Sequence, residues 1–506
     1  MPEIDIKTDP PTRVGVDEWV SQVEKRREPS KGFFGPLARG WVAIPLAWRY
    51  ALMILLLLIA PIVTNTGPVL AFLAISDNAF IVRLLAQFLI FAMLAIGLNV
   101  VVGYAGLLDL GYVAFYGVAG YLYAYLSSDF VQIGGLKGLH LPSLVSVPLI
   151  IVFTMLVGWL LGFISLRLSG DYLAIITLGF GLVFINFVLA ATRIQFWWLD
   201  HPVDLTRGPN GINDLDHIAL FGYTFESTLQ NYYLFFALLI LVYIVVHNLN
   251  QARLGRAWRA MRQDELAAEV MGMPTRRLKL MAFAIGAGIA ALVACVDAGW
   301  QGNVVPNPRY NVLTLINLYA MIVLGGIGSL PGVVLGAFIF TTVPEALRNI
   351  QLAGLLFYGM GLIGLLAWLR PFKRLFVVLG GTIIGGLLLK VAVIALWPGF
   401  QAGAPPPGSI LNQLAQRWLL IPQDFTLAGN LATGSALLLL LLTILVKSHW
   451  RWWLLGLTLY LFAFAWETRL AIEPAATRIL IVGTTLVVLM IVRPQGLLGK
   501  PEVKVV

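Results

Sequence analysis

The sequence is short of the residues that metal and redox chemistry require. Its 506 residues include five histidines and one cysteine, Cys295. A single cysteine excludes an intrachain disulfide and a cluster of cysteine metal ligands. A GxxxxGK[ST] phosphate-binding loop is also absent from the sequence, so any ATP hydrolysis linked to this chain would belong to another subunit. We therefore expect no catalytic residues, no metal site and no cofactor.

Charged residues are equally scarce. They make up 12% of the sequence, whereas 59% of it is hydrophobic, far from the composition of soluble domains. This balance predicts an all-α, polytopic transmembrane helical bundle. The net charge of +9 does not point to nucleic acid, because Lys and Arg lie in loops between apolar segments. The basic loops instead fit contact with membrane lipid at the inner leaflet.

Apolar runs of about 20 residues, the length needed to cross a bilayer, recur along the chain. Early runs lie at about 44–63, 80–102, 141–166, 171–192, 231–249 and 280–299. Together with later runs they predict about 14 spans. Residues 1–43 are polar and are expected to form a cytoplasmic N-terminal tail. An even count of spans places both termini in the cytoplasm of a multi-pass protein of the cell inner membrane.

The charges of two loops predict their sides of the membrane. The segment 194–230 has five acids and one Arg, whereas the segment 253–279 has seven Lys or Arg and three acids. Because basic loops stay on the cytoplasmic side, the first segment should lie outside and the second inside.

Within the basic loop, residues 264–274 have the pattern of a short helix with both ends defined. Asp264 can cap its N-terminus, Gly272 can adopt the left-handed conformation after its end, and Pro274 can begin the next helix. One side of the helix would be apolar, formed by Leu266, Ala267, Val270 and Met271. A helix from Glu265 to Met271 is about 10 Å long, too short to span a bilayer. It is either part of a solvated connector or a docking helix for a cytosolic protein.

Two glycine-rich stretches predict discontinuous helices at membrane depth. The first, 97–121, contains Gly103 and Gly106 with the polar residues Asn99 and Asp109. The second, 323–338, contains Gly328 and a central proline. Broken helices at corresponding places are typical of a transport site, although close helix packing explains the glycines too. We take Asn99, Gly103, Gly106, Asp109 and Gly328 as the candidate translocation path.

Six motifs, in this order, resemble the M-type permease subunit of high-affinity branched-chain amino acid ABC importers. They are GLNVVVGYAGLLDLGYVAF (97–115), LSGDYLAIITLGFG (168–181), TRGPNGI (206–212), LGRAWRAMRQDELAAEVMGMPTRRLKL (254–280), IVLGGIGSLPG (322–332) and RPQGLL (493–498). The resemblance covers most of residues 80–350 and the C-terminal end.

The resemblance implies a non-catalytic permease that forms half of a pore with a second permease subunit. Two cytosolic ATPases and an extracytoplasmic substrate-binding protein would complete the importer. Leucine, isoleucine and valine are the implied substrates, with urea or short amides as the alternative within the family. The basic loop resembles the family's ATPase-coupling element, which implies this role for Gly255, Arg256, Asp264, Glu265, Leu266, Ala267 and Gly272.

The chain departs from the family in two places. Leu182 occupies a position after LGFG where family members often carry an acid. The chain is also longer, since both 345–371 and 467–494 resemble the family's final helix, and only the second continues into QGLL. We interpret 44–370 as the permease core, 371–470 as an inserted transmembrane segment, and 471–506 as the final transmembrane helix and cytoplasmic C-terminus.

Two other classes of membrane protein are weighed against this interpretation. An ion-coupled secondary transporter would need intramembrane acids, for which Asp109, Asp171 and Asp297 are the candidates. A membrane-embedded enzyme would need paired acids or histidines on one face of a span, and the sequence offers none.

Overall fold

The computed structural model describes most of the chain after residue 77. The described residues are 55, 57–62, 78–133, 136–165, 171–195, 202–347, 350–368, 372–396, 410–420, 425–445, 451–470, 483 and 495–498. The predicted N-terminal tail, most of the first span and nearly all of the last apolar run at 471–494 lie outside these residues.

The chain divides into two compact units. The core unit comprises Ala60–Gly354, Pro405–Gln413 and Trp466–Val506, and the smaller unit comprises Met1–Ile59, Leu355–Ala404 and Leu414–Ala465.

Helices make up most of the core unit. They are α5 (Asn78–Asn99), which continues into a π-helical turn (Val100–Tyr104), α6 (Tyr112–Leu126), α7 (Ser143–Ser165), α8 (Asp171–Ala190), α9 (Thr228–Gln251), α10 (Arg253–Gln263), α11 (Glu265–Val270), α12 (Thr275–Gln301), α13 (Val312–Gly325) and α14 (Leu330–Ala346). A 3-10 turn (Gly208–Asn210) lies between α8 and α9.

Three pairs of very short antiparallel strands join the loops of this unit. β1 (Gln132–Ile133) pairs with β2 (Leu136–Lys137), β3 (Ile212–Asn213) with β6 (Asn303–Val304), and β4 (Ala219–Leu220) with β5 (Tyr223–Thr224). The pairing of β3 with β6 fastens the long loop before α9 to the segment that follows α12.

Six helices among the described residues are long and apolar enough to cross a membrane. Five lie in the core unit, at Phe80–Tyr104, Ser143–Ile164, Tyr172–Ala190, Thr228–Gln251 and Thr275–Gln301, and the sixth is Leu375–Leu396. Their positions confirm the all-α, multi-span prediction and agree with the predicted runs to within a few residues. Shorter apolar helices occur beside them, among them α13 and α14.

The centre of the core unit is α12, which packs on α5, α6 and α7. Small residues allow the close approach. A side chain at Gly158 of α7 would collide with Ala287 and the backbone of Phe283, and one at Gly288 would collide with Met155. By contrast, α7 and α8 turn long rows of large apolar side chains outward. Such surfaces suit lipid or another membrane subunit.

The smaller unit contains α16 (Phe372–Leu396), α18 (Phe425–Leu445), α19 (Arg451–Ala465) and parts of α15 (Ile350–Trp368) and α17 (Ile410–Trp418). The core of the smaller unit includes the buried Leu419 and the edge-to-face pair of Trp418 and Tyr460, whose ring centroids are 5.3 Å apart. The π-helical turn that follows α19 (Trp466–Leu470) belongs to the core unit. The Lys390 ammonium donates a 2.8 Å hydrogen bond to the carbonyl oxygen of Arg417, near the end of α17.

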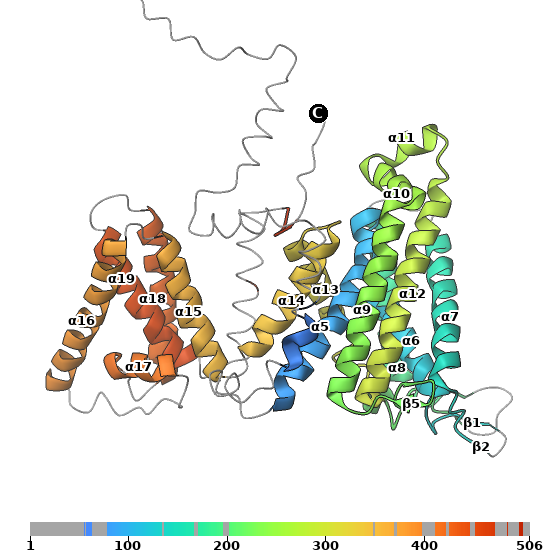
Figure 1. The fold of residues 1–506 in the computed structure, drawn as a ribbon, viewed down its shortest axis with the longest axis horizontal. Helices are drawn as coiled ribbons and strands as arrows, with labels where there is room; N and C mark the ends of the chain where they lie inside the picture. Colours follow the sequence, from blue (N-terminus) through green and yellow to red (C-terminus); the bar gives the residue numbers. More distant parts are fainter. Residues whose placement is uncertain are drawn as a thin grey trace, which may run out of the picture. The chain divides into compact units, whose positions relative to one another are not determined.

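Figure 1 places α10 and α11 at one end of the core unit and the strands β1, β2 and β5 at the other. The basic and acidic segments, which charge assigned to opposite sides of a membrane, therefore lie at opposite ends of this helical bundle.

Candidate translocation gate and docking helix

The first glycine-rich stretch is a break between two helices, as predicted. After α5 the backbone widens into the π-helical turn and leaves helical geometry from residue 105 to 111, before α6 begins. Gly106 lies in this break with a φ of +73°, which favours glycine. Asn99, the last residue of α5, is completely buried.

The second stretch is a tight turn between α13 and α14. Gly326 and Gly328 have positive φ angles, and the Ser329 hydroxyl accepts a hydrogen bond of 3.3 Å from the Gly332 amide at the start of α14. Pro331 stands in the first turn of α14, where backbone N–H groups have no partner within the helix, so the N–H that proline lacks is not needed there. The predicted interruption is present, and it lies ahead of the proline.

The two breaks meet. The Gly328 amide donates a 2.9 Å hydrogen bond to Asn99 Oδ1, and the Tyr319 hydroxyl donates one of 2.7 Å to the carbonyl oxygen of Asp109. No side chain larger than hydrogen fits at Gly103, because a Cβ there would collide with the Asn99 amide group and would lie 2.8 Å from the Gly328 nitrogen. Three of the five predicted path residues, Asn99, Gly103 and Gly328, thus contact one another, and Asp109 contacts α13 through Tyr319.

Several buried polar atoms of this region have no hydrogen-bond partner among the residues that the structure describes. They are Asn99 Nδ2, the hydroxyls of Tyr104 and Tyr112, and Asp109 Oδ2, whose companion oxygen accepts a 2.9 Å bond from the Gly111 amide. An unpaired buried polar group costs stability. We call this cluster and the two breaks the gate region.

Arg262, in the last turn of α10, joins the basic segment to the gate region. Its Nη1 donates a hydrogen bond to the carbonyl oxygen of Gly103, and the same guanidinium lies against Gly328. The aliphatic part of its side chain packs over Gly106, where a Cβ would come within 2.7 Å of the Arg262 Cγ. One side chain from α10 therefore touches both breaks.

The predicted short helix is α11, with the ends that the sequence predicts. Asp264 Oδ1 accepts a 3.0 Å hydrogen bond from the Ala267 amide, and Gly272 has a φ of +80°. Glu265 pairs with Lys279 at 2.6 Å, which fixes α11 to the first turns of α12. The apolar side of α11 and of the residue after it faces away from the protein, and its large residues are exposed: Leu266 (75%), Val270 (87%) and Met271 (81%).

The remaining coupling candidates differ in exposure. Gly255 is buried and lies against the backbone of Asn250, so its part is in packing α10 on the end of α9. Arg256 is exposed and donates a 2.8 Å hydrogen bond to the carbonyl oxygen of Gln251. Ala267 is exposed beside Leu266, whereas Ala268, which the apolar pattern did not include, is buried.

Sequence reasoning missed two residues that position α10. Trp258 is completely buried and donates a 2.9 Å hydrogen bond from Nε1 to the carbonyl oxygen of Leu278. Arg262 was counted among the positive charges only. The signal for Trp258 was the apolar side of α10, where Gly255, Trp258 and Met261 follow one another at helical spacing and are buried together. The sequence carries no such signal for Arg262.

The C-terminal motif QGLL contacts the second break. The amides of Leu497 and Leu498 donate hydrogen bonds of 2.9 and 3.0 Å to the carbonyl oxygens of Leu324 and Gly325. Gly496, with a φ of +77°, lies so close to Gly326 that a Cβ would come within 2.5 Å of its backbone. The motif supplies partners for carbonyls that the end of α13 would otherwise leave unbonded.

Two of the three acids that an ion-coupled transporter would use are paired or lie at a helix end, whereas Asp109 has one carboxylate oxygen without a hydrogen-bond partner among the described residues. Asp297 accepts a hydrogen bond from the Tyr116 hydroxyl and lies 3.4 Å from Arg309 Nη1. Asp171 is the first residue of α8. Within the described part of the chain, no group of three or more His, Cys, Asp or Glu side chains could hold a metal ion.

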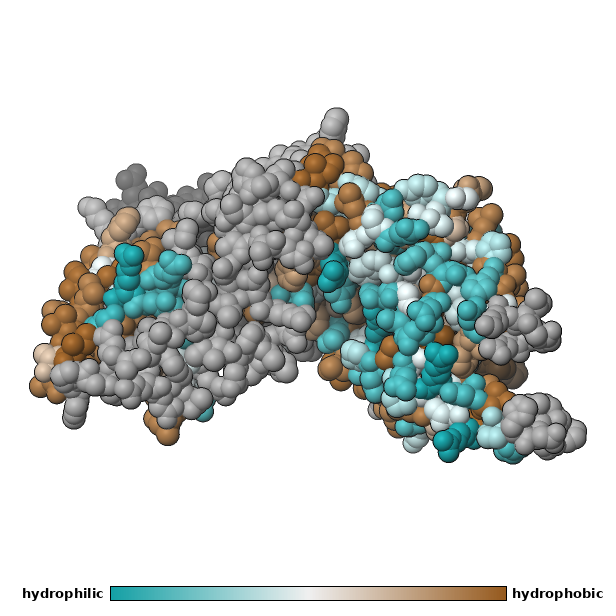
Figure 2. All heavy atoms as spheres, turned by 90° about the horizontal axis from the view of Figure 1, so that it is seen from below, coloured by the Kyte–Doolittle hydropathy of each residue, from teal (hydrophilic) through white to brown (hydrophobic). Residues whose placement is uncertain are grey.

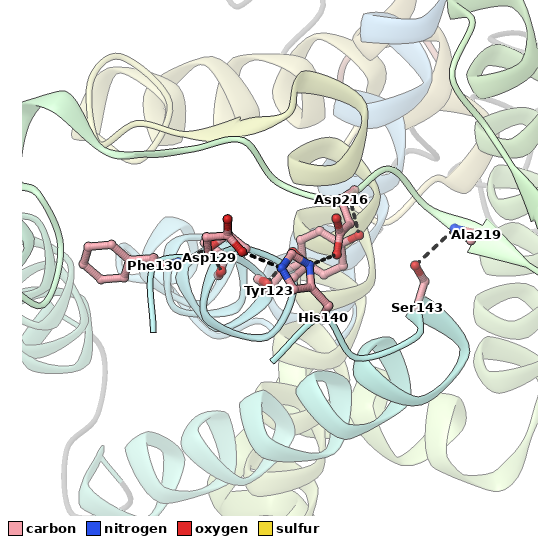
Figure 3. A network of polar contacts seen from close by, with 10 residues as sticks. Tyr123, Asp129, Phe130, His140, Ser143, Asp216 and Ala219 are labelled. Carbon is pink, nitrogen blue, oxygen red and sulfur yellow. Dashed lines mark hydrogen bonds and ion pairs between the residues drawn. The ribbon is translucent and has the colours of Figure 1, made fainter. Parts of the chain in front are cut away.

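At the opposite end of the core unit, His140 joins three segments (Figure 3). Its Nε2 lies 2.7 Å from Asp129 Oδ1, after α6, and its Nδ1 lies 2.7 Å from Asp216 Oδ2, in the acidic loop. Both ring nitrogens can donate only when the imidazole is protonated. Hydrogen bonds to Asp129 and Asp216 accordingly raise the pKa of His140.

Comparison with known proteins gives one consistent family. A model of the permease component of branched-chain amino acid transport systems matches residues 80–396. The high-affinity branched-chain amino acid transport system permease protein LivM of Escherichia coli K12 is 34% identical over 306 residues, which cover 56% of this chain and 67% of LivM.

Two further relatives have related names. The permease protein BraD of Pseudomonas aeruginosa is 26% identical over 257 residues, covering 49% of this chain and 79% of BraD. The permease protein LivH of Escherichia coli K12 is 34% identical over 102 residues, covering 20% of this chain and 32% of LivH. No solved structure matches the chain.

Proposed function

Because this chain belongs to the family of branched-chain amino acid transport permeases, we propose that it forms half of the pore of an ATP-driven importer for leucine, isoleucine and valine. It would do so without catalysing a reaction itself. The relatives are named as permease proteins of transport systems, which supports a transport role rather than an enzymatic one.

The observation that carries this proposal is the continuous path from an exposed apolar helix to a buried gate. The apolar side of α11 has no covering among the described residues, although burying such side chains is favourable. A cytosolic ATPase with an apolar groove is the partner that the family implies for it. From α11 the path runs through α10 to Arg262, and from Arg262 to both breaks.

The mechanism would be a small movement of α10 and α11. When the ATPases close on ATP, they would displace α11, and the ion pair between Glu265 and Lys279 would pass the displacement to α12. Arg262 would move with α10 and release or re-form its hydrogen bond to Gly103, which would change the packing of the two breaks. Such rigid-body shifts of packed helices are an established way of switching between two states.

The other partners follow from the same family assignment. A second permease subunit would complete the pore, two ATPases would bind the end formed by α10 and α11, and an extracytoplasmic binding protein would deliver substrate at the opposite end. In this topology the basic segment 253–279 and both termini are cytoplasmic, with about 14 spans in the inner membrane.

We propose further that residues 371–470 are an accessory segment that the basic transport cycle does not need. Most of this segment lies in the smaller unit, whereas all described gate and docking residues lie in the core unit. The family match nevertheless continues to residue 396, which includes α16. A shortened chain that joins Pro371 to Gln495 keeps the QGLL motif and leaves 345–371, which also resembles the family's final helix, in place of the run 471–494. It should support uptake if the segment is accessory.

The function can be tested by reconstituting the purified complex into vesicles with its binding protein. We expect ATP-dependent accumulation of labelled leucine, isoleucine and valine. Accumulation of urea in their place would favour the amide-importing branch of the family. Accumulation driven by an ion gradient without ATP would instead show a secondary transporter.

A further inference from the structure

The hairpin of β4 and β5 has an aromatic residue where its backbone favours a small one. Its two-residue turn consists of Phe221 and Gly222, whose φ angles are +52° and +84°. Turns with two positive φ angles favour Asn, Asp and Gly, because a larger side chain crowds its own backbone in this conformation. The backbone therefore gives no reason for a phenylalanine at the tip. Phe221 is 93% exposed.

The hairpin itself is held firmly. The Phe225 amide donates a 3.0 Å hydrogen bond to the Ile218 carbonyl oxygen, and Gln230 Nε2 donates one of 2.6 Å to the Tyr223 hydroxyl. The rings of Tyr223 and Phe225 pack edge to face at 5.2 Å. Phe221 is thus presented on an anchored structure.

A contact with α7 shows where the tip lies. The Ala219 amide donates a 3.1 Å hydrogen bond to the hydroxyl of Ser143, the first residue of α7 (Figure 3). Phe221 follows Ala219 by two residues, a distance of at most about 7 Å along an extended chain. The exposed ring therefore lies beside the first turn of a predicted membrane span.

The surface next to the tip is apolar. Leu144, Val145 and Leu149 of α7 are exposed, as is Leu229 of α9, so the outward side of this span is apolar from its first turn. Viewed from this end of the core unit, hydrophilic residues spread over the face and hydrophobic ones appear toward its edges (Figure 2). The loop that contains the hairpin is otherwise rich in acidic residues. Phe221 and Tyr223 therefore differ in character from the rest of this loop.

From this placement we infer that the β4–β5 hairpin binds the membrane surface, with Phe221 and Tyr223 in the headgroup region of the leaflet that α7 enters first. Aromatic rings favour this region, because they are apolar over most of their area and tolerate the polar boundary. The apolar surface of α7 continues to the hairpin, so the lipid that covers α7 also reaches the ring. The inference requires that α7 spans the bilayer, and it does not depend on the substrate.

The single cysteine makes a direct test possible. Cys295 is buried, so a thiol-specific nitroxide label will react with a cysteine introduced at an exposed position. We would label Phe221→Cys in the full chain, reconstituted in vesicles of phosphatidylethanolamine and phosphatidylglycerol. The readout is the ratio of its collisions with O₂, which concentrates in lipid, to its collisions with a water-soluble nickel chelate.

Two controls calibrate the measurement. Val152→Cys lies on the exposed side of α7 and reports the membrane interior, whereas Asp214→Cys lies in the acidic loop and reports water. We expect the ratio for Phe221→Cys to shift from the aqueous control toward the membrane control, and Tyr223→Cys to behave in the same way. The second position also covers the case in which Phe221→Cys alters the turn.

Labels at both hairpin positions that match Asp214→Cys would overturn the inference. It would also be overturned by labels that are aqueous in vesicles and become shielded only when the extracytoplasmic binding protein is added. That result would identify the hairpin as a protein-docking element.

Discussion

The Gly328 amide donates a hydrogen bond to Asn99 Oδ1 over 2.9 Å, which joins two helix breaks that lie 229 residues apart in the sequence. Asn99 is the last residue of α5, and Gly328 lies in the turn between α13 and α14. The bond therefore holds the end of α5 against the turn between α13 and α14, and Arg262 contacts the two breaks at the same place. The gate region depends on this junction.

Replacing Asn99 by alanine should destabilise the protein. The change leaves the Gly328 amide without its partner, and a buried unpaired donor costs about 1–3 kcal/mol. The measurement is thermal unfolding of the purified protein in detergent. Asn186→Ala is the matched control, because Asn186 is exposed on α8 and bonds to the Leu182 carbonyl oxygen of its own helix. Equal losses for the two variants would contradict the proposed junction.

Arg262→Ala should reduce uptake while ATP hydrolysis by the partner ATPases continues. The exposed apolar side of α11 is unchanged in this variant, so binding of the ATPases and their hydrolysis should persist. Uptake should fall by about tenfold or more if the lost contacts are worth at least 1.4 kcal/mol to the coupled movement. Arg253→Ala, which removes an exposed charge from the first residue of the same helix, should behave like the unchanged protein. Normal uptake by Arg262→Ala would exclude Arg262 as the connection.

The effect of a substitution at Gly272 on uptake should depend on whether the new residue tolerates the left-handed conformation, and not on its size. The φ of +80° disfavours a β-branched residue, yet a Cβ at this position would have no neighbour within 4 Å. Gly272→Asn should therefore retain coupled uptake, because asparagine tolerates the left-handed conformation. Gly272→Val should lose much of it, since the left-handed conformation costs about 1–2 kcal/mol for such residues. Similar uptake rates in these two variants would show that the turn does not aim α11.

The loops at the opposite end should lose stability as the pH rises. The folded-state pKa of His140 is raised by its hydrogen bonds to Asp129 and Asp216, so the protonated ring stabilises the folded protein. This contribution is fully present below the ordinary histidine pKa of about 6.5 and disappears as the pH rises through the folded-state value. The difference in unfolding temperature between the natural protein and His140→Asn should shrink over that range. A difference that grows with pH would contradict the proposed stabilisation by the hydrogen bonds of protonated His140 to Asp129 and Asp216.

Local patterns predicted the docking helix and the two breaks, because each depends on residues close together in the sequence. Asp264 and Gly272 carry the conformational preferences that begin and end α11, and glycines weaken helices wherever they cluster. The contact between Asn99 and Gly328 could not be predicted in this way. Nothing in the sequence around either residue indicates which residue it will contact. Only the packing of α5 against α13 and α14 brings them together.

Other residues with long-range contacts could not be predicted from their residue type. Arg262 looks like one more cytoplasmic charge, and its role appears only because the side chain reaches back to Gly103. The tail residues Leu497 and Leu498 act through their backbone amides, which no side-chain pattern reports. His140 bonds to acids 11 and 76 residues away and has no neighbouring motif.

The most direct test of the central claim is ATP-driven leucine uptake by complexes that contain Leu266→Asp. This change places a charge on the exposed apolar side of α11, and burying an unpaired charge in a partner groove costs several kcal/mol. Leu266→Met, which keeps the side chain apolar and similar in volume, is the control. We predict that the aspartate variant enters the membrane normally, fails to co-purify with the ATPases and shows no uptake, while the methionine variant is active. Normal ATP-driven uptake by Leu266→Asp would contradict the proposal that α11 couples the ATPases to the gate.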